Sequence, residues 1–193
     1  MQTPEIIFIM GPQGCGKGTQ ARILAEKLNM YYWEMGGILR ASKEFKLSDG
    51  LTPGEIMDAG NYLSDKQLIE VIEPRLKTLP SAQGIIFDGI PRRMGQAEYL
   101  FNYLAGREYK NLMTLYIDLP REESIKRLLL RAEIEHRADD TRESIESRLK
   151  EHETATLPIL DYMKTKTQFV EIDGTPSIEE VTEEIFRVLD IHE

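Results

Sequence analysis

A glycine-rich segment near the start of the chain most constrains its fold: Gly11-Pro12-Gln13-Gly14-Cys15-Gly16-Lys17-Gly18-Thr19. An apolar run at 6–10 precedes it, and apolar residues at helical spacing follow it at Ala21, Leu24, Ala25 and Leu28. A strand, a glycine-rich turn and a helix in that order are the setting of a P-loop. The glycines let backbone N–H groups turn towards an anion, and the helix N-terminus adds unpaired donors. We therefore expect the loop to hold phosphates, with Lys17 on the β- and γ-phosphates. A turn that binds nothing is the weaker alternative, because motif, strand and helix agree.

Four further apolar runs indicate the other strands of a sheet: 31–33, 84–88, 112–119 and 169–172. They are apolar throughout rather than alternating, which is typical of strands covered by helices on both faces. Helical patterns lie between the runs, so strands and helices alternate along the chain. The expected fold class is α/β: a three-layer P-loop NTPase fold with about five parallel strands.

The chain is expected to form a single domain, 1–193, with two segments inserted into its core. The first, 35–63, contains Pro53, which is expected in the first turn of a helix, and Gly60, which is expected at a helix C-terminus. The second, 131–140, is too short for a domain. The core is then expected at 1–34, 64–130 and 141–193.

Local signals also predict where helices begin and break. Asp140 with Glu143, and Ser177 with Glu180, have the spacing of capping boxes at helix N-termini. Pro158 is expected to kink or interrupt the helix that begins near 140, because proline removes a backbone donor.

Charge and cysteine content exclude several classes of protein. The chain has 24 Lys and Arg against 33 Asp and Glu, a net charge of −9, which argues against a nucleic-acid binder. One cysteine rules out a disulfide framework, and with only three histidines a zinc site is not expected. A reducing, cytoplasmic compartment fits this usage. No apolar run approaches the ~18 residues of a membrane span.

Arginines are numerous after the later strands, although the chain is acidic. One exposed arginine is usually a solvated charge, but a set that faces a phosphate loop would neutralise a phosphoryl group in transfer. The candidates are Arg40, Arg92, Arg93, Arg127, Arg131, Arg137 and Arg148. Asp88, at a strand end near the loop, is expected to hold a Mg²⁺-bound water rather than only to pair with backbone or arginine.

Cys15 and the histidines carry weaker signals. Cys15 is either a small residue that fills a small space, which we favour, or a redox-sensitive thiol at a helix start. His136 is expected in an exposed lid segment, and His152 and His192 are too scattered for a metal site or a catalytic triad.

Six segments together resemble the adenylate kinase family of nucleoside monophosphate kinases, in order and in spacing. They are GPQGCGKGTQA (11–21), IMDAGNYLSD (56–65), DGIPRRMGQA (88–97), RLLLRAEIEHRADD (127–140), RLKEH with TLPILDYM (148–163) and IDGTPSIEEV (172–181). The resemblance runs almost end to end, and Gly18 after the lysine is the family norm. It implies a helical NMP-binding insert at 35–63 and a short lid at 131–140, the lid form without zinc. It also implies a monomer that performs direct in-line transfer, ATP + AMP ⇌ 2 ADP, with Mg²⁺.

The resemblance implies a role for each matching residue. On the ATP side, Arg127 lies on the base, Arg131 reaches the phosphates and Pro176 touches the base; the loop residues are Gly14, Cys15, Gly16, Lys17, Gly18 and Thr19. On the monophosphate side, Arg40 and Arg92 bind the phosphate and Gln96 binds an adenine edge; the remaining lining is Met35, Asn61, Tyr62, Leu63, Gly89, Ile90 and Pro91. Arg137 and Arg148 bridge towards the transferred group. The implied catalytic set is Lys17, Asp88, Arg92, Arg131, Arg137 and Arg148, and no residue binds the metal directly.

Three departures from the family pattern cluster on the monophosphate side. Met35 replaces a threonine whose hydroxyl meets the base, Gly37 replaces an aspartate, and Tyr62-Leu63-Ser64 replaces Leu-Val-Pro or Leu-Val-Thr. Loss of one neutral hydrogen bond costs roughly 0.5–1.5 kcal/mol, enough to blur base preference. A kinase for UMP, CMP or another monophosphate is therefore one alternative. A nucleotide-binding sensor without transfer chemistry is another, although Lys17 and the arginines argue against it. A GTPase switch is weaker still, because the chain has no Asn-Lys-x-Asp.

Overall fold

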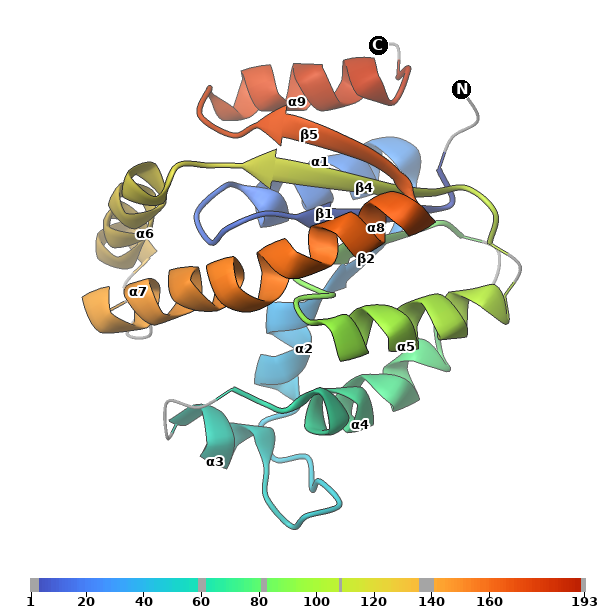
Figure 1. Cartoon of the computed structure of the whole chain (residues 1–193), viewed down its shortest axis with the longest axis vertical. Helices are drawn as coiled ribbons and strands as arrows, with labels where there is room; N and C mark the ends of the chain where they lie inside the picture. Colours follow the sequence, from blue (N-terminus) through green and yellow to red (C-terminus); the bar gives the residue numbers. More distant parts are fainter. Residues whose placement is uncertain (1–3, 59–61, 81–82, 108, 136–140, 192–193) are drawn as a thin grey trace.

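A computed structural model describes residues 4–58, 62–80, 83–107, 109–135 and 141–191 of the chain. Five strands form one sheet in the order β2-β3-β1-β4-β5, and every neighbouring pair is parallel (Figure 1). The strands are β1 (Ile6–Met10), β2 (Tyr31–Glu34), β3 (Ile85–Asp88), β4 (Leu112–Asp118) and β5 (Gln168–Asp173). All five lie where the apolar runs predicted them, and the α/β fold class is confirmed.

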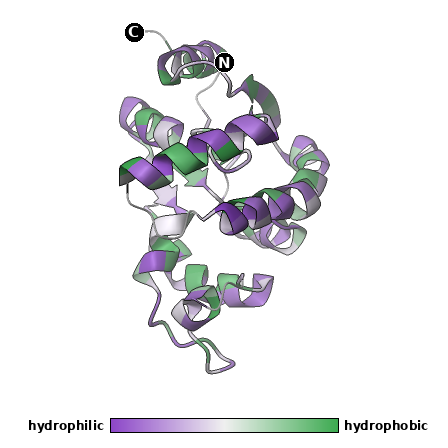
Figure 2. Ribbon diagram, turned by 90° about the vertical axis from the view of Figure 1, so that its left-hand side faces the viewer, coloured by the Kyte–Doolittle hydropathy of each residue, from purple (hydrophilic) through white to green (hydrophobic). Residues whose placement is uncertain are grey.

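Helices cover both faces of the sheet because the strands are apolar on both faces. Ile7 and Ile9 of β1 pack with α1 (Lys17–Leu28) and α9 (Ile178–Val188). Phe8, between them, faces the opposite cluster with α4 (Asp65–Leu76), α5 (Met94–Ala105) and α8 (Leu160–Lys166). Hydrophobic and hydrophilic residues alternate along the helices drawn in Figure 2, as amphipathic packing requires. The result is the expected three-layer arrangement, with β1 in the middle of the sheet.

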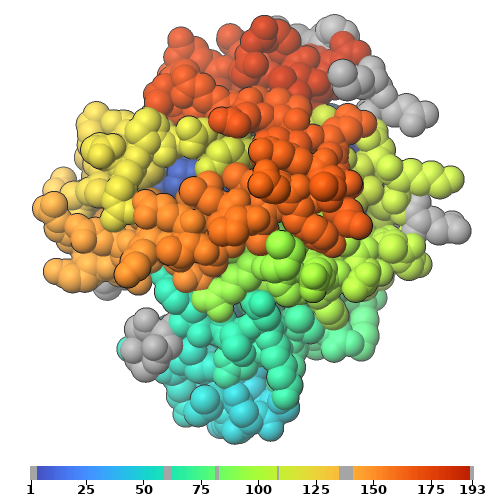
Figure 3. Space-filling view, in the orientation of Figure 1, coloured from blue at the N-terminus to red at the C-terminus, as the bar shows by residue number. Residues whose placement is uncertain are grey.

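Two groups of helices lie outside these layers. The chain after β2 forms α2 (Met35–Ala41) and α3 (Pro53–Asp58), which with α4 make the narrow end of the molecule (Figures 1 and 3). Pro53 is the first residue of α3, as predicted, whereas Gly60 lies outside the described residues. At another side, α6 (Arg121–Glu135) and α7 (Arg142–Glu151) pack around Leu128, Ile145 and Leu149.

The helix-end predictions are partly right. Ser177 and Glu180 form the expected capping box, with Ser177 N donating to Glu180 Oε2 at 2.9 Å and Glu180 N to Ser177 Oγ at 3.2 Å. The predicted cap at Asp140 is wrong. Helix α7 is capped by the next residue, Thr141, whose hydroxyl accepts from Ser144 N at 3.2 Å. A threonine hydroxyl can accept from the unpaired backbone N–H groups of the first turn as an aspartate carboxylate can, and here the cap lies one residue after the predicted one.

Pro158 interrupts the helix as predicted. Between α7 and α8 the backbone makes a π-helical turn, His152–Thr156, and a 3₁₀ turn, Leu157–Ile159. The π turn widens the helix and directs His152 and Thr156 towards the sheet, where both are buried. Within the described residues, no helix is both long and apolar enough to cross a membrane.

Candidate active site

The glycine-rich segment is a loop between β1 and α1, and its backbone requires glycine. Gly11, Gly14 and Gly16 have φ angles of 143°, 88° and 92°, a region that favours glycine. A Cβ on Gly11 would also lie 2.2 Å from the carbonyl oxygen of Ile117 in β4. The loop is therefore held tightly against the carboxyl end of the sheet, at the start of a helix whose N–H groups face the loop.

Lys17, the first residue of α1, closes the loop on itself. Its Nζ donates to the carbonyl oxygens of Gly11 at 2.8 Å and Pro12 at 2.6 Å, and lies 3.6 Å from Cys15 Sγ. Cys15 is 3% exposed and packs in the core on the α1 side of the sheet, which fits the favoured role of a small filling residue.

A second loop, after β3, lies beside the first. Gly89 has a φ of 81° and the Ile90–Pro91 peptide bond is cis. Arg92 Nε donates to the Gly89 carbonyl at 2.9 Å, and the Thr156 hydroxyl donates to the Arg92 carbonyl at 3.1 Å. Burial lowers the pKa of the Arg92 guanidinium from its usual value. The side chain is thus fixed in position before any ligand arrives.

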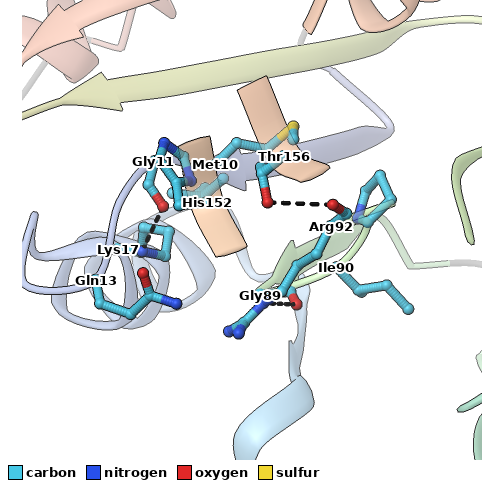
Figure 4. A pocket seen from close by; sticks show the side chains of 11 residues that line it. Met10, Gly11, Gln13, Lys17, Gly89, Ile90, Arg92, His152 and Thr156 are labelled. Carbon is cyan, nitrogen blue, oxygen red and sulfur yellow. Dashed lines mark hydrogen bonds between the residues drawn. The ribbon is translucent and has the colours of Figure 1, made fainter. Parts of the chain in front are cut away.

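Lys17 and Arg92 line one cavity, together with Gln13 and His152 (Figure 4). Figure 4 shows Lys17 and Gln13 on one side of the cavity and Gly89 and Arg92 on the other. The side-chain oxygen of Gln13 is buried without a hydrogen-bond partner among the described residues. Because two cationic side chains from separate loops line the cavity, the cavity is suited to anions. A chain of phosphate groups carries the matching negative charge.

His152 lies at the back of this cavity and is 7% exposed. Its ring stacks on Tyr116 of β4, with centroids 6.2 Å apart, and its Nε2 lies 3.2 Å from the Tyr116 hydroxyl. Burial, with Lys17 and Arg92 nearby, lowers the pKa of His152 from 6.5 to about 4. The imidazole is therefore neutral near pH 7.

Asp88 lies at the end of β3, next to the start of α1. Its Oδ2 accepts from the Tyr32 hydroxyl at 2.9 Å, and a Cβ on Gly18 would lie 3.3 Å from the same oxygen. Burial and the nearby Asp88 raise the pKa of Tyr32, so the phenol stays protonated and orients the carboxylate.

Arg127 lies beside the turn that contains Pro176. Arg127 donates to the carbonyl oxygens of Gly174 at 2.8 Å and Thr175 at 2.9 Å, and to Glu123 at 3.0 Å. Arg131 lies one turn further along α6, and Arg148 lies in α7 near enough to Arg92 to lower its pKa. Arg137 and His136 lie outside the described residues.

The expected monophosphate side is built by α2 and the segment before α4. Met35, Leu63 and Ile90 are buried in one apolar cluster, whereas Tyr62 is exposed. Gln96 is buried and engaged at both ends: its Oε1 accepts from Arg92 N at 2.8 Å, and its Nε2 donates to Asp65 at 3.0 Å.

Arg40 and Asn61 are the other two residues expected on this side. Arg40 is exposed and pairs with Glu34 at 2.7 Å, whereas Asn61 lies outside the described residues.

Sequence reasoning missed four side chains around the site: Gln13, Tyr32, Glu34 and His152. A signal existed for His152, because it follows Arg148 by four residues and so shares one face of the helix. Gln13 lies inside the loop motif but carries no charge. Among the described residues, no group of three or more His, Cys, Asp or Glu could hold a metal ion.

Comparison with known proteins agrees with this arrangement. The family model described as adenylate kinase matches residues 9–168. A protein named adenylate kinase from Leptospira biflexa is 39% identical over 181 residues, which cover 94% of this chain and 97% of the relative. Relatives of the same name from Phocaeicola vulgatus and Maricaulis maris are 34% and 35% identical. The matches cover 93% and 95% of this chain, and 95% and 98% of those proteins.

Proposed function

The chain belongs to the adenylate kinase family, and from this premise we propose that it catalyses reversible transfer of the ATP γ-phosphoryl group to AMP, giving two ADP. The matched region contains both loops of the site, and the relatives named above are covered almost completely. ATP and AMP are the proposed substrates.

One observation carries the proposal: Lys17 and Arg92 face the same cavity from different loops. Lys17 belongs to the loop that suits the ATP phosphates, and Arg92 follows β3, which is adjacent to β1 in the sheet. A phosphoryl group that passes from one nucleotide to the other would therefore be surrounded by positive charge throughout. Transfer of this kind needs positioning and electrostatic stabilisation rather than a covalent intermediate.

The chain's own residues divide the work. Backbone N–H groups from Gly14 to Thr19 hold the donor phosphates, and Lys17 exchanges its two carbonyl partners for phosphate oxygens. Arg92, with Arg40, binds the acceptor phosphate. Arg131, Arg137 and Arg148 surround the group in transfer and exclude water when the segments that carry them close over it. Arg127 and Pro176 hold the adenine of ATP, and Gln96 exchanges its present partners for the acceptor base.

Mg²⁺ fits the residues beside the loop. Asp88 offers a carboxylate oxygen at the start of α1, oriented by Tyr32, and oxygen is the ligand that Mg²⁺ prefers. Asp88 would hold a Mg²⁺-bound water, while the nucleotide phosphates bind the ion directly. When bound, the ion neutralises charge that develops on the phosphate oxygens. The single cysteine, reduced and buried, supports a cytoplasmic enzyme, and we expect a monomer.

A second acceptor is favoured by one observation. Met35 is 3% exposed and belongs to the same apolar cluster as Ile90 and Leu63, whereas a threonine there would offer a hydroxyl to a base. An apolar wall discriminates poorly between bases, so UMP or CMP is the alternative acceptor.

The experiment is an ADP-release assay with Mg·ATP against AMP, UMP, CMP, GMP and dTMP, with Lys17→Met as the blank. AMP is expected to give the highest kcat/KM. A higher value for another monophosphate would overturn AMP as the substrate and make Met35→Thr the next variant. Tight Mg·ATP binding without turnover on any acceptor would instead identify a nucleotide sensor.

A further inference from the structure

Glu34 places a carboxylate in the half of the site that the acceptor is expected to occupy. It is the last residue of β2 and directly precedes α2. Its Oε1 accepts from Arg40 Nη2 at 2.7 Å, and its Oε2 lies 3.7 Å from Arg22 Nη2. Two arginines, from α2 and α1, therefore converge on one carboxylate. The side chain of Glu34 is 34% exposed, so a dissolved anion can reach the pair.

Two glycines make room for this pair. A Cβ on Gly37 would lie 3.3 Å from Glu34 Cδ, so the carboxylate fills the space that a side chain at 37 would take. A Cβ on Gly36 would lie 3.2 Å from Arg40 Nη1, so the guanidinium folds back along the first turn of α2. The pair thus depends on the local sequence from 34 to 40, rather than on a chance meeting of surface charges.

The helix that carries Arg40 begins next to the loop that carries Arg92. β2 and β3 are neighbours in the sheet, and a Cβ on Gly89 would lie 3.4 Å from Met35 Cβ at the start of α2. An anion held by Arg40 on this side of the site would therefore meet the carboxylate of Glu34.

We propose that Glu34 is a positioning residue that acts through Arg40. Its carboxylate binds the Arg40 guanidinium in competition with the acceptor phosphate, so that a higher acceptor concentration is needed to fill the site. The inference rests on the proposed function, which assigns Arg40 to that phosphate. A guanidinium binds carboxylate and phosphate with the same donors, so the two anions compete. After exchange, Glu34 stays as a like charge beside the phosphate, which disfavours the bound state. Arg22 offers the displaced carboxylate a second partner, so the exchange is reversible.

Glu34→Gln tests the inference, because it keeps the shape of the side chain and removes the charge. We expect the Kd of AMP, measured by calorimetry without ATP, to fall roughly threefold to tenfold, the range that a weak ion pair and one removed like charge supply. The KM for AMP should fall by the same factor, and the KM for ATP should stay within about twofold because Lys17 and its loop are unchanged. Glu73→Gln is the matched control. It removes an exposed ion pair of 2.9 Å between Glu73 on α4 and Lys77 just after that helix, and should change none of these constants.

The outcomes separate the two proposals. If the wild-type protein makes ADP from AMP but Glu34→Gln binds AMP no more tightly, Glu34 does not compete and the inference is overturned. Weaker binding of both nucleotides with a lower Tm would assign Glu34 a structural role, and would also overturn it. If the wild-type protein neither binds AMP nor makes ADP, the proposed function itself fails.

Discussion

Replacement of His152 by phenylalanine should change how stability depends on pH. The wild-type imidazole titrates near 4 in the folded protein, against 6.5 for an ordinary histidine, because it is buried near Lys17 and Arg92. At pH 4.5 the imidazole of residue 152 is therefore protonated in the unfolded chain but mostly neutral in the folded protein. Acidification from about pH 7.5 to pH 4.5 should cost the wild type about 2.5 kcal/mol of unfolding free energy through this group alone.

Phenylalanine keeps the ring on Tyr116 but takes up no proton. It loses the contact between His152 Nε2 and the Tyr116 hydroxyl, so the variant should be about 1 kcal/mol less stable than wild type near neutral pH. Near pH 4.5 the order should reverse, with the variant about 1.5 kcal/mol more stable. Urea unfolding followed by circular dichroism at both pH values measures the difference, and the carboxylates common to both proteins cancel. An equal stability gap at the two pH values would refute the reasoning.

Three further substitutions test separate parts of the structure. Lys17→Met should lower turnover at least about 100-fold with a near-native circular dichroism spectrum, because it removes the charge at the phosphates; a wild-type rate would disprove its role. Gly11→Ala should cost more than about 2 kcal/mol in urea unfolding, since its Cβ meets the Ile117 carbonyl at a positive φ; unchanged stability would show that the loop relaxes freely. Ser177→Ala should cost about 1 kcal/mol, or roughly 2–4 °C in calorimetric Tm, through loss of the α9 cap; an unchanged Tm would mean that water replaces the hydroxyl.

The strands and the phosphate loop could be predicted because their signals are local. A continuous apolar run and a glycine that needs positive φ are visible in a few consecutive residues. Strand order was not predicted, since β1 and β2 follow each other in sequence but are separated by β3 in the sheet. Hydrophobic pattern identifies strands without saying which of them pair.

The missed parts of the site depend on tertiary contacts. His152 lies in the π turn that follows α7, and its partner Tyr116 comes from a strand distant in sequence. The pairing of Glu34 with Arg40 depends on where α2 begins, and helix starts are the least certain boundaries in a sequence. The same uncertainty explains why the sequence predicts the cap of α7 at Asp140 and misses Thr141 by one residue. The roles of Arg131 and Arg148 towards nucleotides stay predictions.

The central position of β1 has a consequence for how the two halves of the site fluctuate. Residues 6–9 are fully buried and hydrogen-bonded on both edges, so their amides should exchange with deuterium only when the whole domain opens. The phosphate loop begins at Gly11, directly after the last residue of this strand. By contrast, most of residues 42–52, between α2 and α3, are exposed, and such segments open locally at low free energy. The loop proposed for the ATP phosphates thus directly follows the slowest-exchanging part of the protein, whereas the segment after Arg40 can open without disturbing that strand.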